Sequence, residues 1–544
     1  MTVETPSTPF DVAVLGTHLG CAVLAAILAK QGVRVLLVDA APGQEEFAGE
    51  TTVPYTAEVF FTLARRFDIP ELAAFGLTSA LPSEIRRSSG IKRSLGFLHH
   101  SEGRQQVPEQ AVQFNVPGEH AEWHLYRPHV DQHAWTIARR YGAVVVPHRP
   151  AVADVRVGAG GADVLLADGS LHRARFVVDG SGAGSPLVRR LGAEDAAPKL
   201  RSRSRVLATH MYGVRPFEQC VRQADYVSAT DWSMGTISHL FPGGWLQLAH
   251  FGNGEDPVNP LTSVVLSLDP GRYADLPGEP EQAFRELVRR FPTLARSFKD
   301  AVAARPWTAA RVWQRTAGPA FGEGWFLFDR TFSRNDLFLS RDVTMTAEMV
   351  HALAPALVEA ARRDDWSTPA LRRAALFQER LVDFNDRLLA GARTATTDFR
   401  LWNAYSRVWL LWSMLSALSL KSARNRCLAL GRWEEVERFG DDAFWFRPPD
   451  GLPGLLDRAL GELAEVEAGT SSASACAGRL FTLLRRAPFV PPVYRFADPD
   501  ARYYHFSTAR RLRMLLWSKT VAPAEFRTMM TKENLTNVPP PAMH

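Results

Sequence analysis

The first clear pattern of hydrophobic positions covers residues 11–39, which read DVAVLGTHLGCAVLAAILAKQGVRVLLVD. The apolar run after Asp11 is typical of a buried parallel strand, and Cys21 to Lys30 is rich in alanine and leucine, as in a helix. Gly32 stands where a helix ends, and a second buried strand follows it. The pattern therefore predicts a strand–turn–helix–strand unit within a parallel sheet.

The rest of the chain shows three further patterns. A buried run, ARFVVDGSG, ends at Asp179 and predicts a later strand of the same sheet. Alternating hydrophobic and polar positions between about 200 and 315 predict a mainly antiparallel sheet. From Thr344 onward the hydrophobic spacing is helical, and this continues through 370–480. The tryptophans that we expect to pack this helical region against the body are Trp402, Trp409 and Trp412.

Two of the predicted strands end in aspartate. Asp39 closes the second strand, where a carboxylate can accept a hydrogen bond from the ribose hydroxyls of an adenosine. Asp179 closes the later strand. Together with Gly16 in the first turn, these positions have the frame of a dinucleotide site.

Composition and charge narrow the class of protein. The chain has 544 residues, 46% of them hydrophobic and 22% charged, so two or three subdomains of an ordinary globular protein are expected. A formal charge of +5 is mild, and the arginines are scattered, which argues against a nucleic-acid partner. The four cysteines lie far apart without a CxxC pair, so we expect no metal site, no disulfide framework and a reducing cytoplasm.

The sequence also argues against membrane insertion and secretion. The stretch RVWLLWSMLSALSLK is too short to span a bilayer and is typical of a buried helix. The first ten residues, MTVETPSTPF, lack the basic and apolar regions of a secretory signal. We therefore expect a cytoplasmic protein without a membrane partner.

Several separated motifs, in order along the chain, resemble the flavin-dependent halogenases, in particular the subgroup that includes the chlortetracycline halogenase. The matching stretches are GETTVPYTAEVFFTLARRFDIPEL, SSGIKRSLGFLHH, THMYGVRPFE, FPGGWLQLAHFGN, SRNDLFLSRDVTMTAEMVHALA, LWNAYSRVWLLWSML and FVPPVYRFADP. They cover nearly the whole chain. The resemblance implies an α/β fold with a Rossmann-like domain of the FAD-dependent monooxygenase and halogenase type, an antiparallel substrate-binding sheet and a helical C-terminal region.

The implied domains follow the hydrophobic patterns. They are residues 1–199 for the first part of the Rossmann-like domain, with a substrate-side insertion near 75–125; 200–315 for the substrate sheet; 316–365 for the return to the Rossmann-like domain; and 366–544 for the helical domain.

The resemblance also implies a chemistry. In this family reduced FAD reacts with oxygen to a hydroperoxide, halide attack releases hypohalous acid, and a lysine presents that acid to an electron-rich aromatic substrate. The lysine motif matches at Lys92, and Glu50 matches the glutamate of the family's Gly-Glu pair. The positions at which the family's flavin contacts fall here are Gly16, His18, Asp39, Asp179, Ser340 and Arg341.

The first departure from the family lies in the nucleotide-binding turn. The register of G-x-G-x-x-G falls on Gly16, His18 and Cys21. The second glycine normally lets the backbone approach a pyrophosphate, and the third allows close packing of helix on strand. A His18 side chain projects where phosphate oxygens belong, although a protonated imidazole could donate to an anion. We therefore expect weakened nucleotide binding.

The second departure is GWLQLAHF, where the family has Trp-x-Trp-x-Ile-Pro as a wall between flavin and substrate. Trp245 matches the first tryptophan, while Gln247, Ala249 and His250 replace the other three residues. We expect Trp245 and Gln247 to line the substrate pocket. One interpretation has Gln247 and His250 facing one reaction chamber, with His250 as an acid or base near neutral pH. The alternative is an ordinary strand with satisfied hydrogen bonds.

The third departure is LFDRTFSRNDLFLSR, where the family has Ala-Ala-Gly-Phe-x-Asp-Pro-x-x-Ser-Arg-Gly beside the flavin and halide. Aligned through Asp336, Ser340 and Arg341, the glycines become Ser333 and Asp342. The proline becomes Leu337, and Thr331 and Phe332 replace two alanines. Close approach of the backbone to a flavin ring is harder with these side chains present.

Three motifs that face the ligand are thus rewritten, while the motifs that pack the fold persist. Our leading hypothesis is a halogenase-fold tailoring enzyme of natural-product biosynthesis, repurposed to flavin-independent acid–base chemistry such as a cyclisation, dehydration or rearrangement. Its substrate is a polyketide-like or aromatic small molecule, free or carrier-bound, and its expected catalytic residues are Lys92, His250 and Glu50.

Two alternatives remain open from the sequence. The first is an active FADH2-dependent halogenase or monooxygenase with a tolerant nucleotide site, which needs a partner flavin reductase. The second is a non-catalytic binding protein for a pathway intermediate, in which the basic stretch at Arg510, Arg511 and Arg513 contacts an acidic carrier protein.

Overall fold

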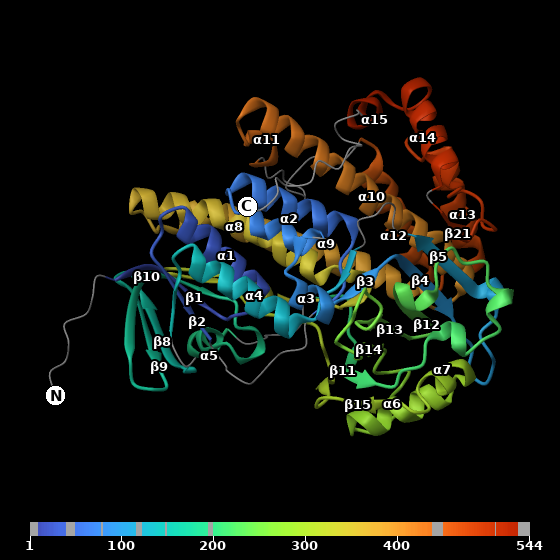
Figure 1. The fold of residues 1–544 in the computed structure, drawn as a ribbon, viewed down its shortest axis with the longest axis horizontal. Coiled ribbons are helices and arrows are strands. Elements are labelled where there is room, and N and C mark those ends of the chain that lie inside the picture. Colours follow the sequence, from blue (N-terminus) through green and yellow to red (C-terminus); the bar gives the residue numbers. More distant parts are fainter. Residues whose placement is uncertain are drawn as a thin grey trace.

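The first two strands of the chain are neighbours in a largely parallel sheet, here called sheet A, and a helix connects them (Figure 1). In this computed structural model the described residues are 9–39, 49–77, 80–115, 122–146, 150–193, 200–437, 450–505 and 507–530. The main path of sheet A runs β18 (Phe321–Gly322), β19 (Trp325–Leu327), β10 (Leu171–Asp179), β1 (Phe10–Leu15), β2 (Val35–Val38) and β7 (Val144–Val145). The pair β8 (Val152–Gly158) and β9 (Gly161–Leu166) extends it from β10. The strand–turn–helix–strand prediction for 11–39 is confirmed.

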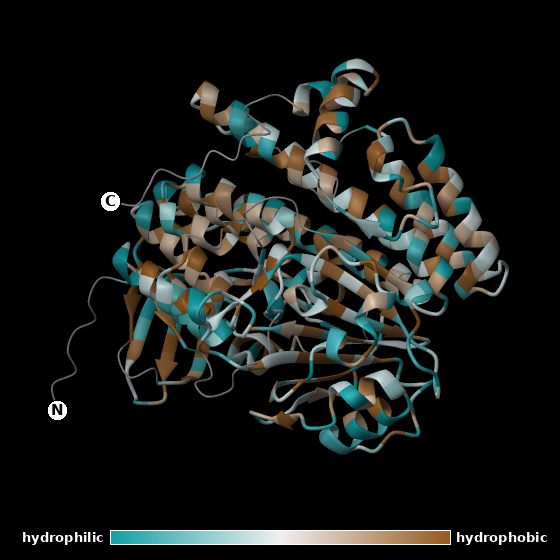
Figure 2. Cartoon of the chain, turned by 45° about the vertical axis from the view of Figure 1, so that its right-hand side comes forward, coloured by the Kyte–Doolittle hydropathy of each residue, from teal (hydrophilic) through white to brown (hydrophobic). Residues whose placement is uncertain are grey.

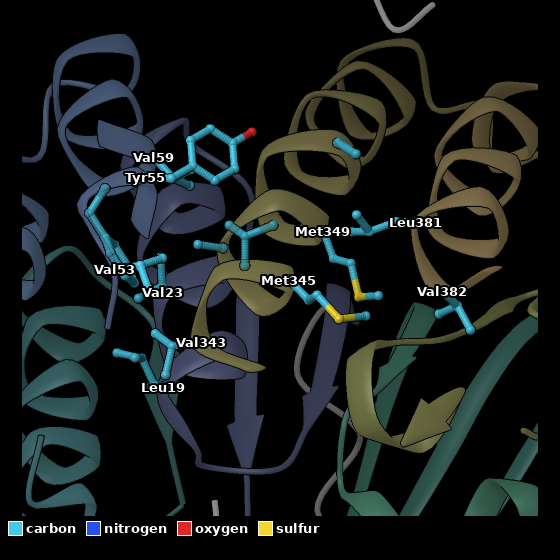
Figure 3. Packing of buried hydrophobic residues seen from close by; sticks show 14 of the residues in the cluster. Leu19, Val23, Val53, Tyr55, Val59, Val343, Met345, Met349, Leu381 and Val382 are labelled. Carbon is cyan, nitrogen blue, oxygen red and sulfur yellow. The ribbon is translucent and has the colours of Figure 1, made fainter. Parts of the chain in front are cut away.

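The helix between β1 and β2 is buried on nearly all sides. In α1 (Leu19–Lys30) every residue from Leu19 to Leu28 is buried, which explains why its sequence is apolar all round rather than on one stripe. Two helices pack on it, α4 (Arg127–Arg140) and α8 (Asp342–Arg363). Figure 3 shows Leu19 and Val23 of α1 close to Val343 at the start of α8. Segments more than 300 residues apart therefore meet at the N-terminal end of α1.

The second sheet, sheet C, is mainly antiparallel, with two parallel pairs at one end. Its order is β15 (Val302–Ala303), β11 (Arg205–Tyr212), β14 (Thr262–Leu268), β13 (Gly244–His250), β12 (Thr236–Phe241), β4 (Ser94–His99), β5 (Ala111–Asn115) and β21 (Tyr503–Tyr504), with β16 (Thr308–Ala310) beside β11. The parallel pairs are β12 with β4 and β5 with β21. The segment predicted as an insertion near 75–125 thus supplies two strands of sheet C, β4 and β5.

Sheet C separates two hydrophobic cores. On one face Leu246 and Leu248 pack with residues of α6 (Pro280–Arg289) and α7 (Pro292–Ser297), which lie at the bottom right of Figure 1. On the other face Trp245 belongs to the main core shared with sheet A and the C-terminal helices. This second face is the one that can border a site between the two sheets.

The helical C-terminal region closes the main core. It contains α9 (Thr368–Ala395), α10 (Phe399–Leu430), α11 (Glu434–Glu437), α12 (Leu452–Glu467), α13 (Ala473–Arg486), α14 (Thr508–Thr520) and α15 (Ala524–Met529). Trp402, Trp409 and Trp412 of α10 are buried, as their spacing predicts. Brown and teal residues recur side by side along these helices in Figure 2, as expected of amphipathic segments. None of the described helices combines the length and hydropathy that crossing a bilayer requires.

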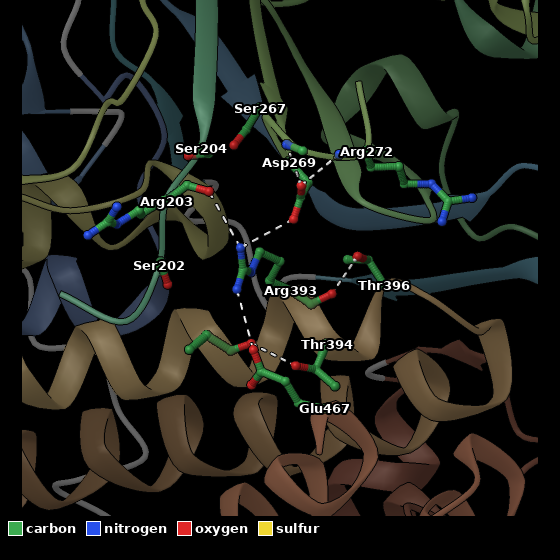
Figure 4. A network of polar contacts seen from close by, with 12 residues as sticks. Ser202, Arg203, Ser204, Ser267, Asp269, Arg272, Arg393, Thr394, Thr396 and Glu467 are labelled. Carbon is green, nitrogen blue, oxygen red and sulfur yellow. Dashed lines mark hydrogen bonds and ion pairs between the residues drawn. The ribbon is translucent and has the colours of Figure 1, made fainter. Parts of the chain in front are cut away.

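Arg393 ties α9 to both neighbours (Figure 4). Its guanidinium lies 3.6 Å from a carboxylate oxygen of Asp269 at the end of β14 and donates to the Arg203 carbonyl at 3.4 Å. A second contact, at 3.5 Å, reaches Glu467 at the end of α12. One side chain therefore connects sheet C to two helices of the C-terminal region.

Candidate active site

Lys92 lies on a short two-stranded ribbon between the two sheets. The ribbon pairs β3 (Gly90–Lys92) with β6 (Glu122–His124) in antiparallel register, which places Lys92 directly opposite Glu122. The Lys92 side chain is fully buried. Its Nζ donates to the Thr52 carbonyl oxygen and, at 3.3 Å, to Ser340 Oγ. The same nitrogen is 3.9 Å from Glu122 Oε2, so the ammonium has three oxygen neighbours and no exposure to solvent.

Burial shifts the pKa values of both Lys92 and Glu122. Loss of hydration lowers the pKa of Lys92 to about 8, and the attraction of Glu122 opposes that change. Loss of hydration raises the pKa of Glu122 to about 8, and here the attraction of Lys92 works in the other direction. Burial thus favours the uncharged form of each group, which is typical of ionisable side chains at functional sites.

The loop after Asp336 presents Ser340 to Lys92. Leu339 and Ser340 both have left-handed backbone conformations, with φ of 62° and 55°, which cost roughly 1–3 kcal/mol each for residues other than glycine. Ser340 Oγ accepts a hydrogen bond from Thr51 Oγ1 at 2.6 Å as well as from Lys92. The strained turn thus fixes a hydroxyl beside the lysine.

Arg341, the next residue, points away from Lys92. Its guanidinium donates to Glu348 Oε2 of α8 at 3.1 Å and to Asn385 Oδ1 of α9 at 2.8 Å. Glu348 also accepts a hydrogen bond from the Tyr55 hydroxyl at 2.8 Å. Arg341 and Glu348 are both buried, so this arginine joins helices in the core, and its expected role beside a cofactor stays a prediction.

Glu50 has a histidine partner. Both of its carboxylate oxygens lie 3.0 Å from His210 Nε2, and both side chains are buried. The rings of Tyr126 and Phe251 lie against the imidazole, with centroids 5.6 and 5.5 Å away. Glu50 and His210 form a second buried acid–base pair near the ribbon, because the Glu50 carbonyl accepts a hydrogen bond from Leu125, which follows β6.

Strand β13 presents Trp245, Gln247 and Ala249 to the main core. The Trp245 ring stacks on Phe338, with centroids 4.9 Å apart and planes 12° from parallel, which gives the site a flat aromatic wall. The Gln247 amide makes no side-chain hydrogen bond to the described part of the chain. Phe338 also stacks on Trp402 of α10, with centroids 5.3 Å apart, so Trp245 and Gln247 face the main core beside an aromatic stack.

His250 lies on the other face of this strand. Successive strand residues point to opposite faces, so His250 shares a side with Leu246 and Leu248 rather than with Gln247. Its Nδ1 is 2.9 Å from Thr262 Oγ1, and burial lowers its pKa to about 4, so the ring is neutral at pH 7. These findings correct the interpretation in which Gln247 and His250 line one chamber and His250 titrates near neutral pH.

The turn before α1 is closed by His18. Gly16 keeps the left-handed φ of 112° that suits a glycine. His18 Nδ1 accepts from the Gly20 amide at 3.2 Å, while Nε2 is 2.7 Å from the Gly180 carbonyl oxygen and must donate to it. Burial lowers the pKa of His18 to about 4, so the expectation of a protonated ring binding an anion is not supported. Cys21 Sγ packs 3.3 Å from the same imidazole.

A carboxylate also caps α1. Asp131 Oδ1, from α4, accepts from the Leu19 amide at 3.2 Å and from Arg127 Nε at 2.8 Å. Arg127 in turn donates to the Gly49 carbonyl at 3.0 Å. In dinucleotide-binding folds the first amides of this helix donate to the pyrophosphate. Here two of them donate to Asp131 and His18, so in this conformation these residues do not fit a pyrophosphate.

The third rewritten motif lies beside this cap. Arg330 forms an ion pair with Asp342, whose Oδ2 also accepts from the Gly49 amide at 3.2 Å. Asp329 has a φ of 53° and accepts a hydrogen bond from Thr346, and its burial raises its pKa to about 7. The charged side chains of this segment therefore have partners at the start of α8.

The two strand-end aspartates differ in their surroundings. Asp179 accepts from the Ser181 amide at 2.9 Å and the Ser185 hydroxyl at 2.7 Å, so it holds the turn after β10. Asp39 is partly exposed at the end of β2. Neither arrangement tests whether these carboxylates contact a nucleotide, and both roles stay predictions.

Three residues of the site were not expected from the sequence. Each of them contacts a partner that is distant in the sequence. The pairs are Glu122 with Lys92, His210 with Glu50, and Asp131 with the amide of Leu19. Only the cross-strand register and the contact of α4 with α1 bring them together. No group of three or more metal-ligating side chains occurs in the described ranges.

Comparison with known proteins identifies relatives over the whole length. The chain is 30% identical over 538 residues to monodechloroaminopyrrolnitrin halogenase PrnC of Pseudomonas fluorescens, which covers 96% of this chain and 94% of that protein. It is also 30% identical over 531 residues to tetracycline 7-halogenase of Kitasatospora aureofaciens, with 96% and 95% covered. No family model matches the chain.

Solved structures agree with these relatives. Crystal structures of halogenase PltM superpose with a TM-score of 0.84 at 26% identity, covering 91% of this chain and 99% of that one. One of them contains phloroglucinol and FAD. The myxobacterial chondrochloren halogenase CndH, at 17% identity and a TM-score of 0.56, shares the fold alone. The predicted fold class is confirmed, and the chain belongs to the flavin-dependent halogenase family.

Proposed function

We propose that this member of the family is a tailoring enzyme of natural-product biosynthesis that works by acid–base chemistry without a flavin. The proposed reaction is a cyclisation, dehydration or rearrangement of an aromatic or polyketide-like small molecule. The observation that carries the proposal is a contrast within one molecule. Lys92 is retained with a carboxylate and a hydroxyl beside it, whereas the first amides of α1 donate to Asp131 and His18.

The proton affinities support this chemistry. Because the pKa values of Lys92 and Glu122 both lie at about 8, both groups are mainly protonated at pH 7, so either can donate a proton to a substrate as a general acid and becomes available as a base as the pH approaches 8. The neighbouring Ser340 hydroxyl can orient a substrate oxygen without changing charge. None of these steps needs an electron acceptor.

The walls of the site support the substrate class. Trp245, Phe338 and Trp402 form an aromatic stack beside β13, and the Gln247 amide lies on the same face of the strand as Trp245. Such a combination suits a planar, partly hydroxylated ring system. The relatives are named for halogenation of monodechloroaminopyrrolnitrin and of tetracycline.

A second candidate is an FADH2-dependent halogenase. It is favoured by the names of the relatives, by the FAD in a PltM crystal structure and by the retention of Lys92 and Gly16. For this function Asp131 and His18 must release the amides of α1 when the cofactor binds, and a flavin reductase must supply reduced flavin.

Anaerobic turnover distinguishes the two candidates. The purified protein is incubated with extracts that contain the late pathway intermediates, without flavin, oxygen or halide, and the products are followed by mass spectrometry. We expect conversion to a product of the same mass or of that mass less one water. A reaction that requires reduced flavin, oxygen and halide, and that adds a halogen to the product, would contradict the proposal.

A further inference from the structure

Helix α14 has basic residues and no acidic residue. The cations in its sequence, TARRLRMLLWSKT, are Arg510, Arg511, Arg513 and Lys519. Neither Arg513 nor Lys519 forms an ion pair with any described residue. On α6, by contrast, Arg285 pairs with Glu281 one turn away at 3.3 Å. The positive charge of α14 is therefore not neutralised within the described part of the chain.

The same helix exposes two leucines between its cations. Leu512 and Leu516 are 62% and 66% exposed and lie one turn apart, so they share one face of the helix. Arg513 and Lys519 are also exposed and flank the leucines on either side. Apolar side chains repeated at positions i and i+4 of an exposed helix face are typical of a helix that docks into a groove of a partner.

The opposite face of α14 is anchored to the body of the protein. Met514 and Trp517 pack against the main core. The Trp517 ring meets the ring of Phe526 in α15 edge to face, with centroids 5.1 Å apart. The Ser507 hydroxyl caps the helix by accepting from the Arg510 amide at 3.3 Å. Because α14 lies at the periphery of the helical region in Figure 1, an anchored helix presents the leucines to solvent.

We propose that this face of α14 is the docking site of a small acidic helical protein of the acyl-carrier type, which carries the substrate. Leu512 and Leu516 enter an apolar groove between its helices, and Arg513 and Lys519 pair with carboxylates at the rim of that groove. The inference goes beyond the proposed function, because docking does not depend on the reaction that follows.

A membrane surface fits this face less well. Helices that bind in the bilayer interface bury a broad apolar face, whereas here two leucines stand between cations and Trp517 packs against the core. A small apolar centre with charged groups around it instead matches protein interfaces, in which a few anchors are surrounded by a polar rim. An acidic partner also supplies the negative charge that α14 lacks.

The test measures binding of a fluorescently labelled acyl carrier protein of bacterial fatty-acid synthesis, a small acidic helical protein, to the full-length protein by fluorescence anisotropy. We expect saturable binding in the micromolar range that weakens as the salt concentration rises. The double variant Leu512→Ser/Leu516→Ser and the single variant Arg513→Glu should each weaken binding by about tenfold or more. Arg190→Glu, at an exposed arginine of α5 (Pro186–Leu191), makes the same charge reversal elsewhere and should leave the affinity unchanged.

All of these substitutions are at exposed positions, so circular dichroism should show a folded protein in each case. Equal affinities of the wild type and the leucine double variant would overturn the proposal, as would the absence of saturable binding to the wild type. Binding to anionic phosphatidylglycerol vesicles without binding of the carrier protein would overturn it in favour of a membrane surface. Because the assay contains neither substrate nor flavin, its result is independent of the proposed function.

Discussion

Replacement of Lys92 by methionine is expected to lower product formation by about 10²- to 10⁴-fold, the range of a lost acid–base group. Methionine keeps the length and apolar stem of the buried side chain. It removes the ammonium group, and with it the contacts to Thr52, Ser340 and Glu122. The measurement is product titre by mass spectrometry in the producing pathway, with the variant protein at wild-type abundance.

Two further variants make this expectation specific. Lys92→Arg should remain at least tenfold impaired, because a guanidinium is larger and keeps its proton at neutral pH. Lys299→Met, at an exposed lysine after α7, should leave the titre unchanged. A Lys92→Met protein that is folded and forms product at the wild-type level would exclude Lys92 from the chemistry.

Acidification is expected to unfold this protein steeply, because five buried histidines and the partly buried His18 are held neutral. Burial lowers the pKa of His18 and His250 to about 4 and that of His124 and His239 to about 3, and it also lowers those of His100 and His351 well below 6.5. Below pH 6.5 the unfolded chain binds protons at these histidines that the folded chain binds only at a lower pH. The free energy of unfolding should therefore fall by about 1.4 kcal/mol per histidine for each pH unit in that window.

The measurement is the urea midpoint between about pH 7 and about pH 5. In His18→Asn the slope should fall by about one proton, because asparagine keeps the helix cap but does not titrate. A midpoint that stays constant over this range would contradict the neutral, buried state of these side chains.

The sequence was sufficient for features that depend on local spacing. The continuous apolar run before Gly16 and the alanine-rich segment after it predicted β1 and α1, and the structure confirms both. Trp402 and its neighbours were expected in the core for the same reason, since one long helix buries them together. The family resemblance identified Lys92 as a candidate catalytic residue, and the structure shows that its side chain is buried.

Features that depend on pairing between distant segments could not be predicted in this way. Glu122 becomes important only because β3 and β6 pair in the register that places it opposite Lys92. The side of β13 on which His250 lies follows from the alternation that starts at Trp245, and a motif alignment does not show it. Asp131 caps α1 only because α4 packs against that helix.

The retained fold and the changed residues at the N-terminus of α1 both support the proposal of a function without flavin. Family members share the overall architecture, as the TM-score of 0.84 with PltM shows, but fold alone does not determine chemistry. In this chain Asp131 and His18 accept hydrogen bonds from the amides to which a dinucleotide would bind. The account therefore predicts that the scaffold kept its lysine site and lost its flavin.

The most direct test of that claim is the visible absorbance spectrum of the purified protein, followed by calorimetric titration with FAD. We expect a colourless protein and no saturable binding of FAD at micromolar concentrations. A yellow protein with a flavin spectrum, or an FAD dissociation constant in the micromolar range, would contradict the account.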